Sequence, residues 1–515
     1  RFLNPERVSM PDIDTDLPDI YREDVINYVR EKYGDKKVAG IVTFSTMSAK
    51  QVLRDVARVL KIPNYKIDRL NSFIPPMGKE RLDYYYQHDR LFKSEIDNDK
   101  DLKETYLIAS RLEGFPRQIG THAAGIVMCQ KNLDEVLPLT KSDDMYLTSY
   151  SMNYLEELGL LKMDFLGIKN LTLIMNILKD IEENLHIKIP FYDIPLDDSK
   201  CYQLFTKAFT TGIFQFESSG MRKFLRELKP NNFEDIVAAI ALFRPGPAAN
   251  IDTYIKRKEG REKVTYLDNS LEPILKKTYG IMIYQEQVMQ TVSYYADYSL
   301  GEADILRRAI SKKKKDVLIE EEERFLRKAK ALGKDENISK ELFAQILKFA
   351  GYGFNRSHAV AYSMVAYKMA YLKVHYPLYF YTNLLSNVIG VESKLNEYVR
   401  EVRSVKIKIV KPDINLSTSM FRVVDSKILF PFSTIKGIGV SVCKTIIKAR
   451  CEEFTDIFMA IRSLVVAGIT KKQLETLILA DTFRNFNYNK KTLITNLDSL
   501  YNYGELVKDL DPSLV

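Results

Sequence analysis

Three aspartates stand at alternate positions near the start of the chain, in VSMPDIDTDLPD at residues 8–19. A β-strand has a side-chain period of two, so Asp12, Asp14 and Asp16 would project from one face of such a strand. Like charges on one face of a sheet repel each other, and a divalent cation between them reverses that penalty. Oxygen-only ligands suit Mg²⁺ or Mn²⁺. Spacing alone leaves a second interpretation open, a solvated acidic turn.

A further carboxylate lies in LLKMDFLG at residues 160–167. In a strand, Lys162 and Asp164 would share one face, and Met163 and Phe165 would share the other. A charged pair in so apolar a strand is costly unless it is paired or metal-bound, so a buried Lys–Asp ion pair is the alternative to a metal site. Two strands that each present carboxylates fit a two-metal site for phosphoryl or nucleotidyl transfer.

Cations for the phosphates of such a substrate occur in the second half of the chain. Arg307 and Arg308 precede the run Lys312–Lys315, and Arg244 precedes Pro-Gly-Pro, a rigid turn that would fix its direction. Arginine is the better bidentate phosphate ligand, and lysine the more diffuse charge. The lysine run is explained more simply as a solvated helix face that the glutamates at 319–324 balance.

Aromatic and polar residues gather in AGYGFNRSHAVAYS at residues 350–363. Tyr352 stands between two glycines, which permit close approach, so its ring could lie flat against a base or sugar. The polar residues after it include Ser357 and His358. The alternative is that the aromatic rings pack in a core and that His358 is a structural histidine.

The stretch KGIGVSVCKTII at residues 436–447 resembles a helix-hairpin-helix. Glycines in such a turn expose backbone N–H groups to a DNA phosphate, which recognises the backbone and not the base sequence. Lys436, Gly437 and Gly439 are therefore candidate DNA contacts. Many tight turns carry the same Gly-x-Gly spacing, so the motif alone is weak.

Hydrophobic periodicity and turn residues indicate the elements that must position these side chains. The pattern predicts a β-containing unit that a helical insertion interrupts, followed by a mainly helical region with a short β-like stretch. The expected elements are helices at 22–34 (ended by Gly34), 47–62 and much of 63–110, strands at 38–44, 122–129 and 159–168, helices over 170–400, short strands within 405–434, a helix-turn-helix at 434–450, and a last stretch that is helical and polar.

Composition bounds the class of protein. The 515 residues, 46% of them hydrophobic, are enough for three to four domains. No apolar run is long enough for a transmembrane helix, and four scattered cysteines argue against a disulfide framework or a cysteine zinc site and favour a reducing cytoplasm. The net charge of +8, from 76 basic and 68 acidic residues, is compatible with a polyanionic partner but weak by itself. The start on Arg1 suggests a segment of something longer.

Taken together, these residues resemble the bacterial replicative DNA polymerase III alpha subunit family. The motifs that carry the resemblance run in family order from residue 1 to about 390. The PDIDTD form favours the DnaE type over the PolC type, in which the third acid is usually Asn. The matching stretches are RFLNPERVSMPDIDTD, TFSTMSAKQVLRDVARVL, GTHAAGIVM, LLKMDFLGIKNLTLI, GIFQFESSGM, ALFRPGP, YGIMIYQEQVMQ, LRRAISKKK and FAGYGFNRSHAVAYSMVAYKMAYLKVHYP.

The resemblance implies an α+β fold. Its parts would be a polymerase-beta-like nucleotidyltransferase palm with a mixed sheet, an inserted helical thumb and a large, mainly α-helical fingers domain that ends in a helix-hairpin-helix region. The expected boundaries are palm at 1–43 and 120–170, thumb at 44–119, fingers at 171–430, and helix-hairpin-helix with C-terminal helices at 431–515.

The resemblance also implies the site. Asp12, Asp14 and Asp164 match the metal-binding catalytic triad, which leaves Asp16 a neighbour. The cofactor would be two Mg²⁺ ions, for which Mn²⁺ can substitute. Residues that match positions associated with the incoming nucleotide are Arg1, Lys162, Arg307, Arg308, Tyr352, Ser357 and His358, with Arg244 added on the chemistry above.

The implied function is DNA-directed DNA polymerase, the catalytic core of the bacterial chromosomal replicase, in the cytoplasm beside the nucleoid. Its partners would be primer-template DNA and dNTP, with no membrane, and the sliding clamp and clamp loader through regions outside this segment. The family's Gly-Ser phosphate-binding motif would also lie outside it. Ser45, Gln118 and the pair Ala480-Asp481 depart from the family pattern. Two alternatives stay open: a two-metal nuclease or phosphatase, and a non-catalytic DNA-binding fragment.

Overall fold

The computed structural model describes residues 13–75, 78, 80–142, 145–244, 246–311, 315–350 and 353–510. The chain divides into two compact units, Arg1–Leu171 and Thr172–Val515, and each is described by itself. Three residues predicted to act at the site, Arg1, Asp12 and Tyr352, lie outside the described residues.

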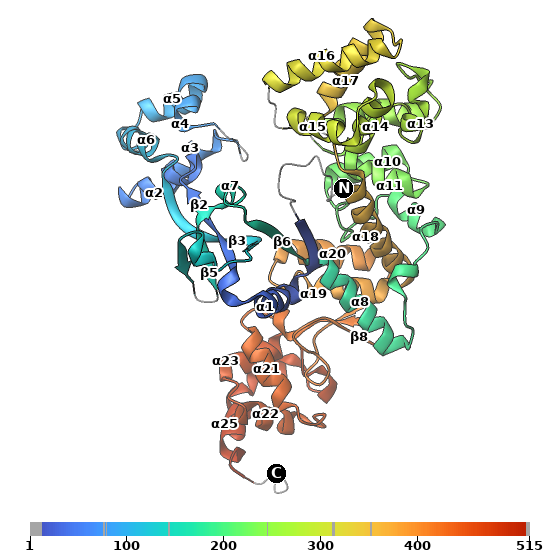
Figure 1. Cartoon of the computed structure of the whole chain (residues 1–515). Helices are drawn as coiled ribbons and strands as arrows, with labels where there is room; N and C mark the ends of the chain where they lie inside the picture. Colours follow the sequence, from blue (N-terminus) through green and yellow to red (C-terminus); the bar gives the residue numbers. More distant parts are fainter. Residues whose placement is uncertain are drawn as a thin grey trace. The chain divides into compact units, whose positions relative to one another are not determined.

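The first unit is built on a mixed sheet, as predicted. Within the described residues it has six strands in the order β1-β6-β3-β2-β5-β4. Figure 1 shows this sheet, with β2, β3, β5 and β6 labelled. The neighbours β1 and β6 are parallel, as are β2 and β5, and the other pairs are antiparallel. The strands are β1 (Ile13–Pro18), β2 (Val38–Thr46), β3 (Pro116–Met128), β4 (Leu139–Lys141), β5 (Tyr146–Ser151) and β6 (Leu161–Ile168).

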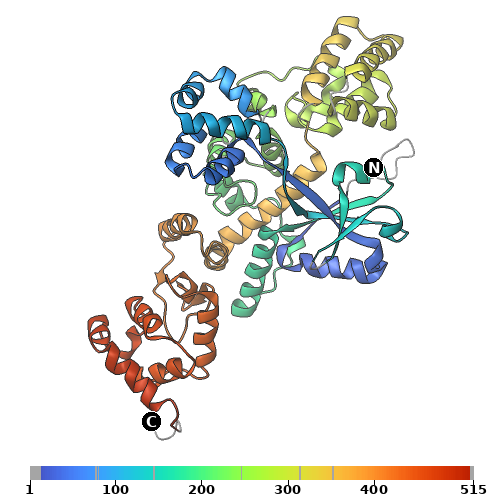
Figure 2. The same ribbon diagram turned by 90° about the vertical axis from the view of Figure 1, so that its left-hand side faces the viewer.

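Helix α1 (Arg22–Tyr33) packs on one face of this sheet (Figure 2). It ends at Gly34, as the sequence predicts. Gly34 has a φ of +101°, in the region that favours glycine. Phe165 of β6 packs with Ile26 and Val29 of α1 in one buried cluster. Alternation along β6 then turns Lys162 and Asp164 to the opposite face.

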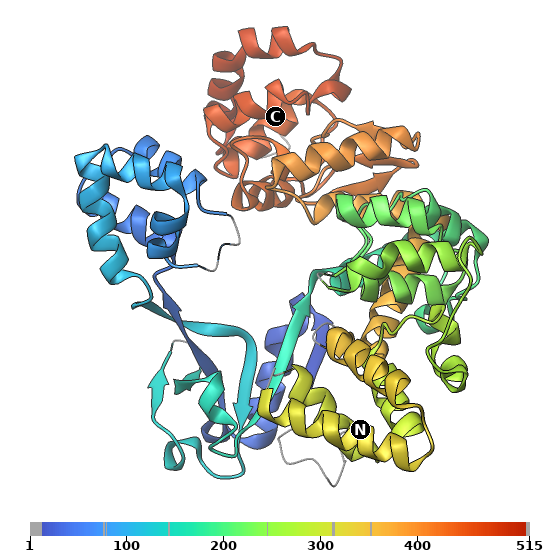
Figure 3. The same cartoon turned by 90° about the horizontal axis from the view of Figure 1, so that it is seen from above.

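Helices fill the segment between β2 and β3. They pack on a buried core of their own, which includes Leu53, Leu70 and Phe92. Figure 3 shows β2 and β3 running out of the sheet toward these helices. Asp89 and Asp99 cap two of them by accepting hydrogen bonds from backbone N–H groups of the first turn. The helices are α2 (Ala49–Val59), α3 (Asn64–Ser72), α4 (Leu82–His88), α5 (Arg90–Asp97) and α6 (Lys100–Leu112).

Short helices complete the first unit, and helices dominate the second. The first unit also has η1 (Asp19–Tyr21), η2 (Asp35–Lys37), η3 (Leu133–Glu135) and α7 (Met152–Leu155). From the unit boundary onward the helices are α8 (Lys169–Leu185), α9 (Ser199–Thr206), α10 (Ser219–Leu228), α11 (Phe233–Leu242), α12 (Ile251–Lys258), α13 (Glu272–Leu275), α14 (Gln285–Ala296), α15 (Leu300–Ser311), α16 (Lys315–Ala331), α17 (Glu336–Ala350), α18 (Arg356–His375), α19 (Pro377–Ser386) and α20 (Glu392–Ser404). The 3₁₀ helices are η4 (Phe191–Asp193), η5 (Pro247–Asn250), η6 (Asn269–Leu271), η7 (Lys276–Thr278), η8 (Phe432–Thr434) and η9 (Arg484–Phe486).

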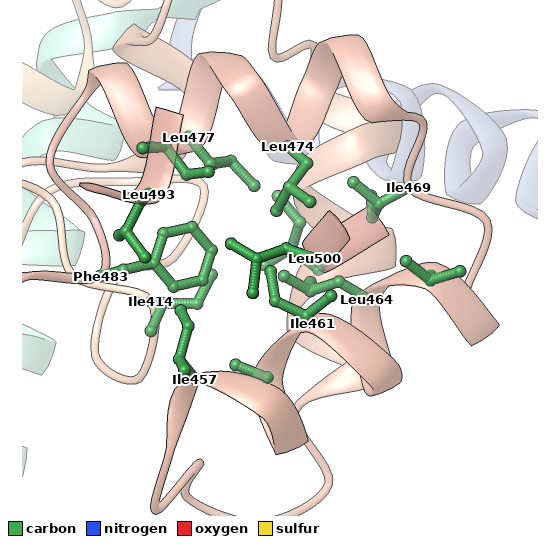
Figure 4. Close-up of a cluster of buried hydrophobic side chains, with 14 of the residues drawn as sticks. Ile414, Ile457, Ile461, Leu464, Ile469, Leu474, Leu477, Phe483, Leu493 and Leu500 are labelled. Atoms are coloured by element: carbon green, nitrogen blue, oxygen red, sulfur yellow. The ribbon is translucent and has the colours of Figure 1, made fainter. Parts of the chain in front are cut away.

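The C-terminal part begins with short strands, as predicted, and ends in helices. The strands are β7 (Ile409–Val410), β8 (Arg422–Val424) and β9 (Lys427–Leu429). The helices are α21 (Val440–Ala449), α22 (Ile457–Val466), α23 (Lys471–Leu479), α24 (Lys490–Thr495) and α25 (Leu497–Val507). The prediction that this last stretch is polar is wrong, because Ile461, Leu477 and Leu500 meet in a buried apolar core (Figure 4).

The predicted helix-turn-helix at 434–450 is also only partly correct. One helix, α21, follows the glycines, but a single 3₁₀ turn, η8, precedes them. Ile438 is buried and Ile435 packs against the same core. A tight turn is therefore enough to bury both of these apolar residues, whose spacing suggested a helix. No helix in the described part of the chain is long and apolar enough to cross a membrane.

Candidate active site

Two of the predicted carboxylates lie on neighbouring strands. In the parallel register of β1 and β6, the Cα atoms of Asp14 and Asp164 are partners. Paired residues of adjacent strands point to the same face, with the strands about 4.8 Å apart. The pairing therefore sets both carboxylates side by side on the face opposite α1. Asp14 and Asp16 are exposed, and Asp164 is only 8% exposed.

The two oxygens of Asp164 differ in their surroundings. Lys162 Nζ lies 2.8 Å from Asp164 Oδ2. The ion pair that the sequence left as an alternative is thus present. Asp164 Oδ1 is buried and accepts no hydrogen bond from the described residues. A buried carboxylate oxygen without a partner is costly, so a ligand at this oxygen would remove that cost.

The donor set fits a hard divalent cation, which prefers carboxylate oxygens. Asp14 and Asp164 would hold it. Among the residues that the structure describes, no group of three or more His, Cys, Asp or Glu is close enough to form a metal site. The third predicted ligand, Asp12, lies outside those residues.

Sequence reasoning missed two residues beside Asp164. The imidazole Nδ1 of His122 accepts hydrogen bonds from the backbone N–H groups of Ala124 (3.3 Å) and Gly125 (2.7 Å). Gly125 is the register partner of Asp164 across β3 and β6. The sequence GTHAAGIVM contains an indication of this feature, Gly125, because a glycine inside a strand pattern marks a bulge or a close approach of the backbone.

The arginine pair predicted to bind the nucleotide lies in the second unit, on α15. One carboxylate holds both side chains: Asp304 Oδ1 is 2.8 Å from Arg307 Nη2, and Asp304 Oδ2 is 2.9 Å from Arg308 Nε. Burial by itself would raise the pKa of Asp304, but the hydrogen bonds and charges of the two arginines outweigh it and hold that pKa below its usual range.

A hydrogen-bonded link connects this arginine pair to the segment before α18. Arg307 Nη1 donates to Gln285 Oε1 at 3.3 Å, and Gln285 Nε2 donates to the carbonyl of Gly353 at 2.8 Å. Arg244 lies over the ring of Phe354, 3.7 Å from its centroid. Arg244 thus contacts Phe354 directly, whereas Arg307 is linked to the neighbouring Gly353 through Gln285.

The start of α18 carries the other predicted nucleotide contacts. Asn355 caps the helix, since its side-chain oxygen accepts from the N–H groups of Ser357 (3.0 Å) and His358 (3.3 Å). Both residues are exposed. The backbone N–H of Arg356 donates to Glu286 Oε2 at 2.8 Å, which fixes the helix start to α14. The His358 ring packs against Tyr362, with 4.0 Å between centroids.

The candidate DNA contacts form an exposed turn. Lys436, Gly437 and Gly439 are all exposed, and Gly437 has a φ of +95°. A Cβ at either glycine would meet nothing within 4 Å. Gly439 is the N-cap residue of α21. The turn thus presents backbone close to a helix start, which is the geometry that suits a phosphate.

Family models match most of the chain. The model described as "Bacterial DNA polymerase III alpha NTPase domain" matches residues 1–167, and "Bacterial DNA polymerase III alpha subunit finger domain" matches residues 170–333. A model described as "Helix-hairpin-helix motif" matches residues 406–493.

Two relatives that match the chain are each named DNA polymerase III subunit alpha. The chain is 46% identical over 508 residues to DNA polymerase III subunit alpha of Bacillus subtilis (strain 168), covering 98% of this chain and 46% of that protein. It is 47% identical over 502 residues to DNA polymerase III subunit alpha of Staphylococcus aureus (strain COL), covering 97% of this chain and 47% of that protein. The chain thus spans slightly less than half the length of these relatives.

Proposed function

The chain belongs to the bacterial DNA polymerase III alpha subunit family, and on this premise we propose that it is the catalytic part of a DNA-directed DNA polymerase. The reaction would join a dNTP to the 3′-hydroxyl of a primer and release pyrophosphate. Primer-template DNA and dNTP would be its substrates, and the cytoplasm beside the nucleoid its place of action. The sliding clamp and clamp loader would bind the longer protein.

The observation that carries this proposal is the register of Asp14 and Asp164, together with a buried oxygen of Asp164 that has no hydrogen-bond partner among the described residues. Divalent metal ions bound there would lower the pKa of the attacking hydroxyl and neutralise the leaving group. Asp14 and Asp164, with Asp12, would hold two Mg²⁺ ions, for which Mn²⁺ can substitute.

Basic residues would offset the charge of the triphosphate. Lys162 holds the second oxygen of Asp164, so it lies beside the proposed reacting centre and would bind a phosphate oxygen there. Arg307 and Arg308 would bind the outer phosphates, since guanidinium groups form bidentate contacts with phosphate. The proposed nucleotide contacts also include Arg1, Arg244, Tyr352, Ser357 and His358.

The domain assignment is part of the proposal. Residues 1–43 and 120–170 would form the palm, 44–119 the thumb, 171–430 the fingers and 431–515 the helix-hairpin-helix region. The mixed sheet and the separate core of α2–α6 support the first two assignments. Lys436, Gly437 and Gly439 would contact the DNA backbone.

Primer extension with Mg²⁺ and dNTPs tests the carboxylates, in the full-length polypeptide that contains this chain. Asp14→Asn and Asp164→Asn remove ligand charge at little change in shape, so extension should fall at least about 100-fold while DNA binding stays within threefold. Asp16→Asn is the matched control, because Asp16 is exposed on the same face two residues from Asp14. It should extend like the wild type.

Three results would contradict the proposal in different ways. Normal extension by Asp14→Asn and Asp164→Asn would remove the metal assignment. Primer degradation by the wild type without dNTPs would favour the nuclease alternative. DNA binding without extension by the wild type would favour a non-catalytic DNA-binding protein.

A further inference from the structure

Strand β3 departs from regular pairing with β2 at two places, and one of them lies directly beside Asp164. Gly40 of β2 pairs with Ile126, and Val42 pairs with Thr121. One residue of β2, Ile41, therefore stands opposite the four residues 122–125 of β3. Such irregularities leave backbone N–H groups without a ladder partner and re-aim neighbouring side chains. We call residues 122–125 the β3 bulge.

His122 supplies the missing hydrogen-bond partner of the bulge. Its Nδ1 accepts from the N–H groups of Ala124 and Gly125 at 3.3 Å and 2.7 Å. A backbone N–H can only donate, so Nδ1 carries no proton and the neutral ring holds its proton on Nε2. The His122 side chain thus accepts hydrogen bonds from two backbone N–H groups of its own bulge.

The bulge ends where β3 leaves β6. The two strands pair from Met128 with Leu161 up to Gly125 with Asp164. Asp164 is therefore the last residue of β6 in this ladder, and the bulge determines where the backbone of Gly125 lies against its carboxylate.

Gly125 leaves no room for a side chain. A Cβ there would lie 2.8 Å from Asp164 Oδ1, 2.8 Å from His122 Nδ1 and 2.9 Å from Ile41 Cδ1. Ile41 is 0% exposed, so the atoms packed around it resist its displacement. The carboxylate of Asp164 is thus confined between the Lys162 ammonium at Oδ2 and the glycine backbone at Oδ1.

From these contacts we infer that His122 and Gly125 are positioning residues for Asp164. They set the direction of the oxygen that the proposed metal would bind, and they act through the backbone of the bulge. The inference rests on the proposed function for its activity readout, but its metal-binding readout does not need polymerase activity.

Mn²⁺ binding tests the inference in the full-length polypeptide, without DNA or dNTP. Free Mn²⁺ is measured by electron paramagnetic resonance for the wild type, Gly125→Ala, His122→Ala and His122→Asn. Gly125→Ala and His122→Ala should raise the half-saturating Mn²⁺ concentration about 10- to 100-fold, the usual effect of removing support from a metal ligand. His122→Asn keeps an acceptor at the place of Nδ1 and should restore binding to within about threefold of the wild type.

The matched control is Gly120→Ala in the same strand. Its Cβ would meet only the Thr43 hydroxyl, at 3.2 Å. It should bind Mn²⁺ and melt like the wild type. In primer extension, the two damaging variants should lower kcat more than tenfold and change KM for dNTP less than threefold, because the nucleotide contacts stay in place.

Wild-type Mn²⁺ affinity in both Gly125→Ala and His122→Ala would overturn the inference, as would equal losses in His122→Asn and His122→Ala. If His122→Ala fails to fold, judged by circular dichroism, Gly125→Ala decides the question because it keeps the imidazole side chain in the protein. If the wild type binds Mn²⁺ but does not extend primers, the proposed function fails while the Mn²⁺ series still decides the inference.

Discussion

At the scale of single residues, two aspartates, Asp164 and Asp304, are held by ion pairs with basic side chains. Asp164 is paired on one oxygen and without a partner among the described residues on the other. Asp304 is paired on both oxygens, each with a different arginine. The first arrangement suits a group that receives a ligand. The second suits a group that orients two cations.

Asp304→Asn tests that orienting role. Loss of the charge releases the two guanidinium groups from a common anchor, so triphosphate binding should weaken. We expect KM for dNTP to rise about tenfold, or roughly 1.4 kcal/mol, close to the lower end of the usual range for hydrogen bonds to charged groups. The change in kcat should be less than threefold. Steady-state primer extension over a dNTP series measures both.

Glu302→Gln is the control for Asp304. Glu302 lies on the same helix, but it pairs with Lys328 at 3.1 Å and with Arg324, so KM should not change. An unchanged KM in Asp304→Asn would contradict the orienting role, and a lower KM would show that the aspartate competes with the nucleotide for the arginines.

The pKa of Asp304 is lowered in the fold. The stability that this carboxylate contributes is therefore present above its unfolded pKa, about 3.9, and is lost as the pH falls through the folded value.

At the scale of elements, the sequence predicted correctly those features that depend on neighbouring residues, such as helix ends and the alternation of side chains along a strand. Gly34 ends α1, and the alternation in LLKMDFLG sets Lys162 and Asp164 on one face, as expected. The β3 bulge was not predicted, because register depends on pairing with β2, some 80 residues away in the chain. The helix expected before Gly437 was wrong, since the buried contacts of Ile435 and Ile438 need only one turn.

The start of α18 offers a test at this scale. Asn355→Ala removes the acceptor for the N–H groups of Ser357 and His358, a loss of about 1 kcal/mol at a helix N-cap. Hydrogen exchange of residues 356–362 should quicken about fivefold, since 1 kcal/mol is a factor of about five. Asn355→Asp keeps the acceptor and should exchange like the wild type. Equal exchange in all three proteins would show that the cap does not stabilise the helix start.

At the scale of the whole molecule, the sequence predicted a β-containing unit followed by helices, and the division near residue 171 agrees with that order. It did not predict the apolar core that joins α21–α25, because the residues of this core come from segments spread over Ile414 to Leu500. The exposed turn at Lys436 is therefore held by a core built from distant parts of the chain.

This arrangement leads to a prediction for DNA binding. The net charge of +8 is a small difference between 76 basic and 68 acidic residues, so binding should depend on where lysines contact phosphates. If Lys436 makes one phosphate contact, Lys436→Ala should weaken binding equally for unrelated DNA sequences. It should also lower the slope of log affinity against log salt by about 1.

Lys276→Ala is the control, because it changes the net charge equally. The ammonium of Lys276 is paired with Glu272 at 3.1 Å, so its loss should leave the slope unchanged. Fluorescence anisotropy of labelled primer-template DNA over a salt series measures both slopes, and equal slopes for the two variants would remove Lys436 from the DNA interface.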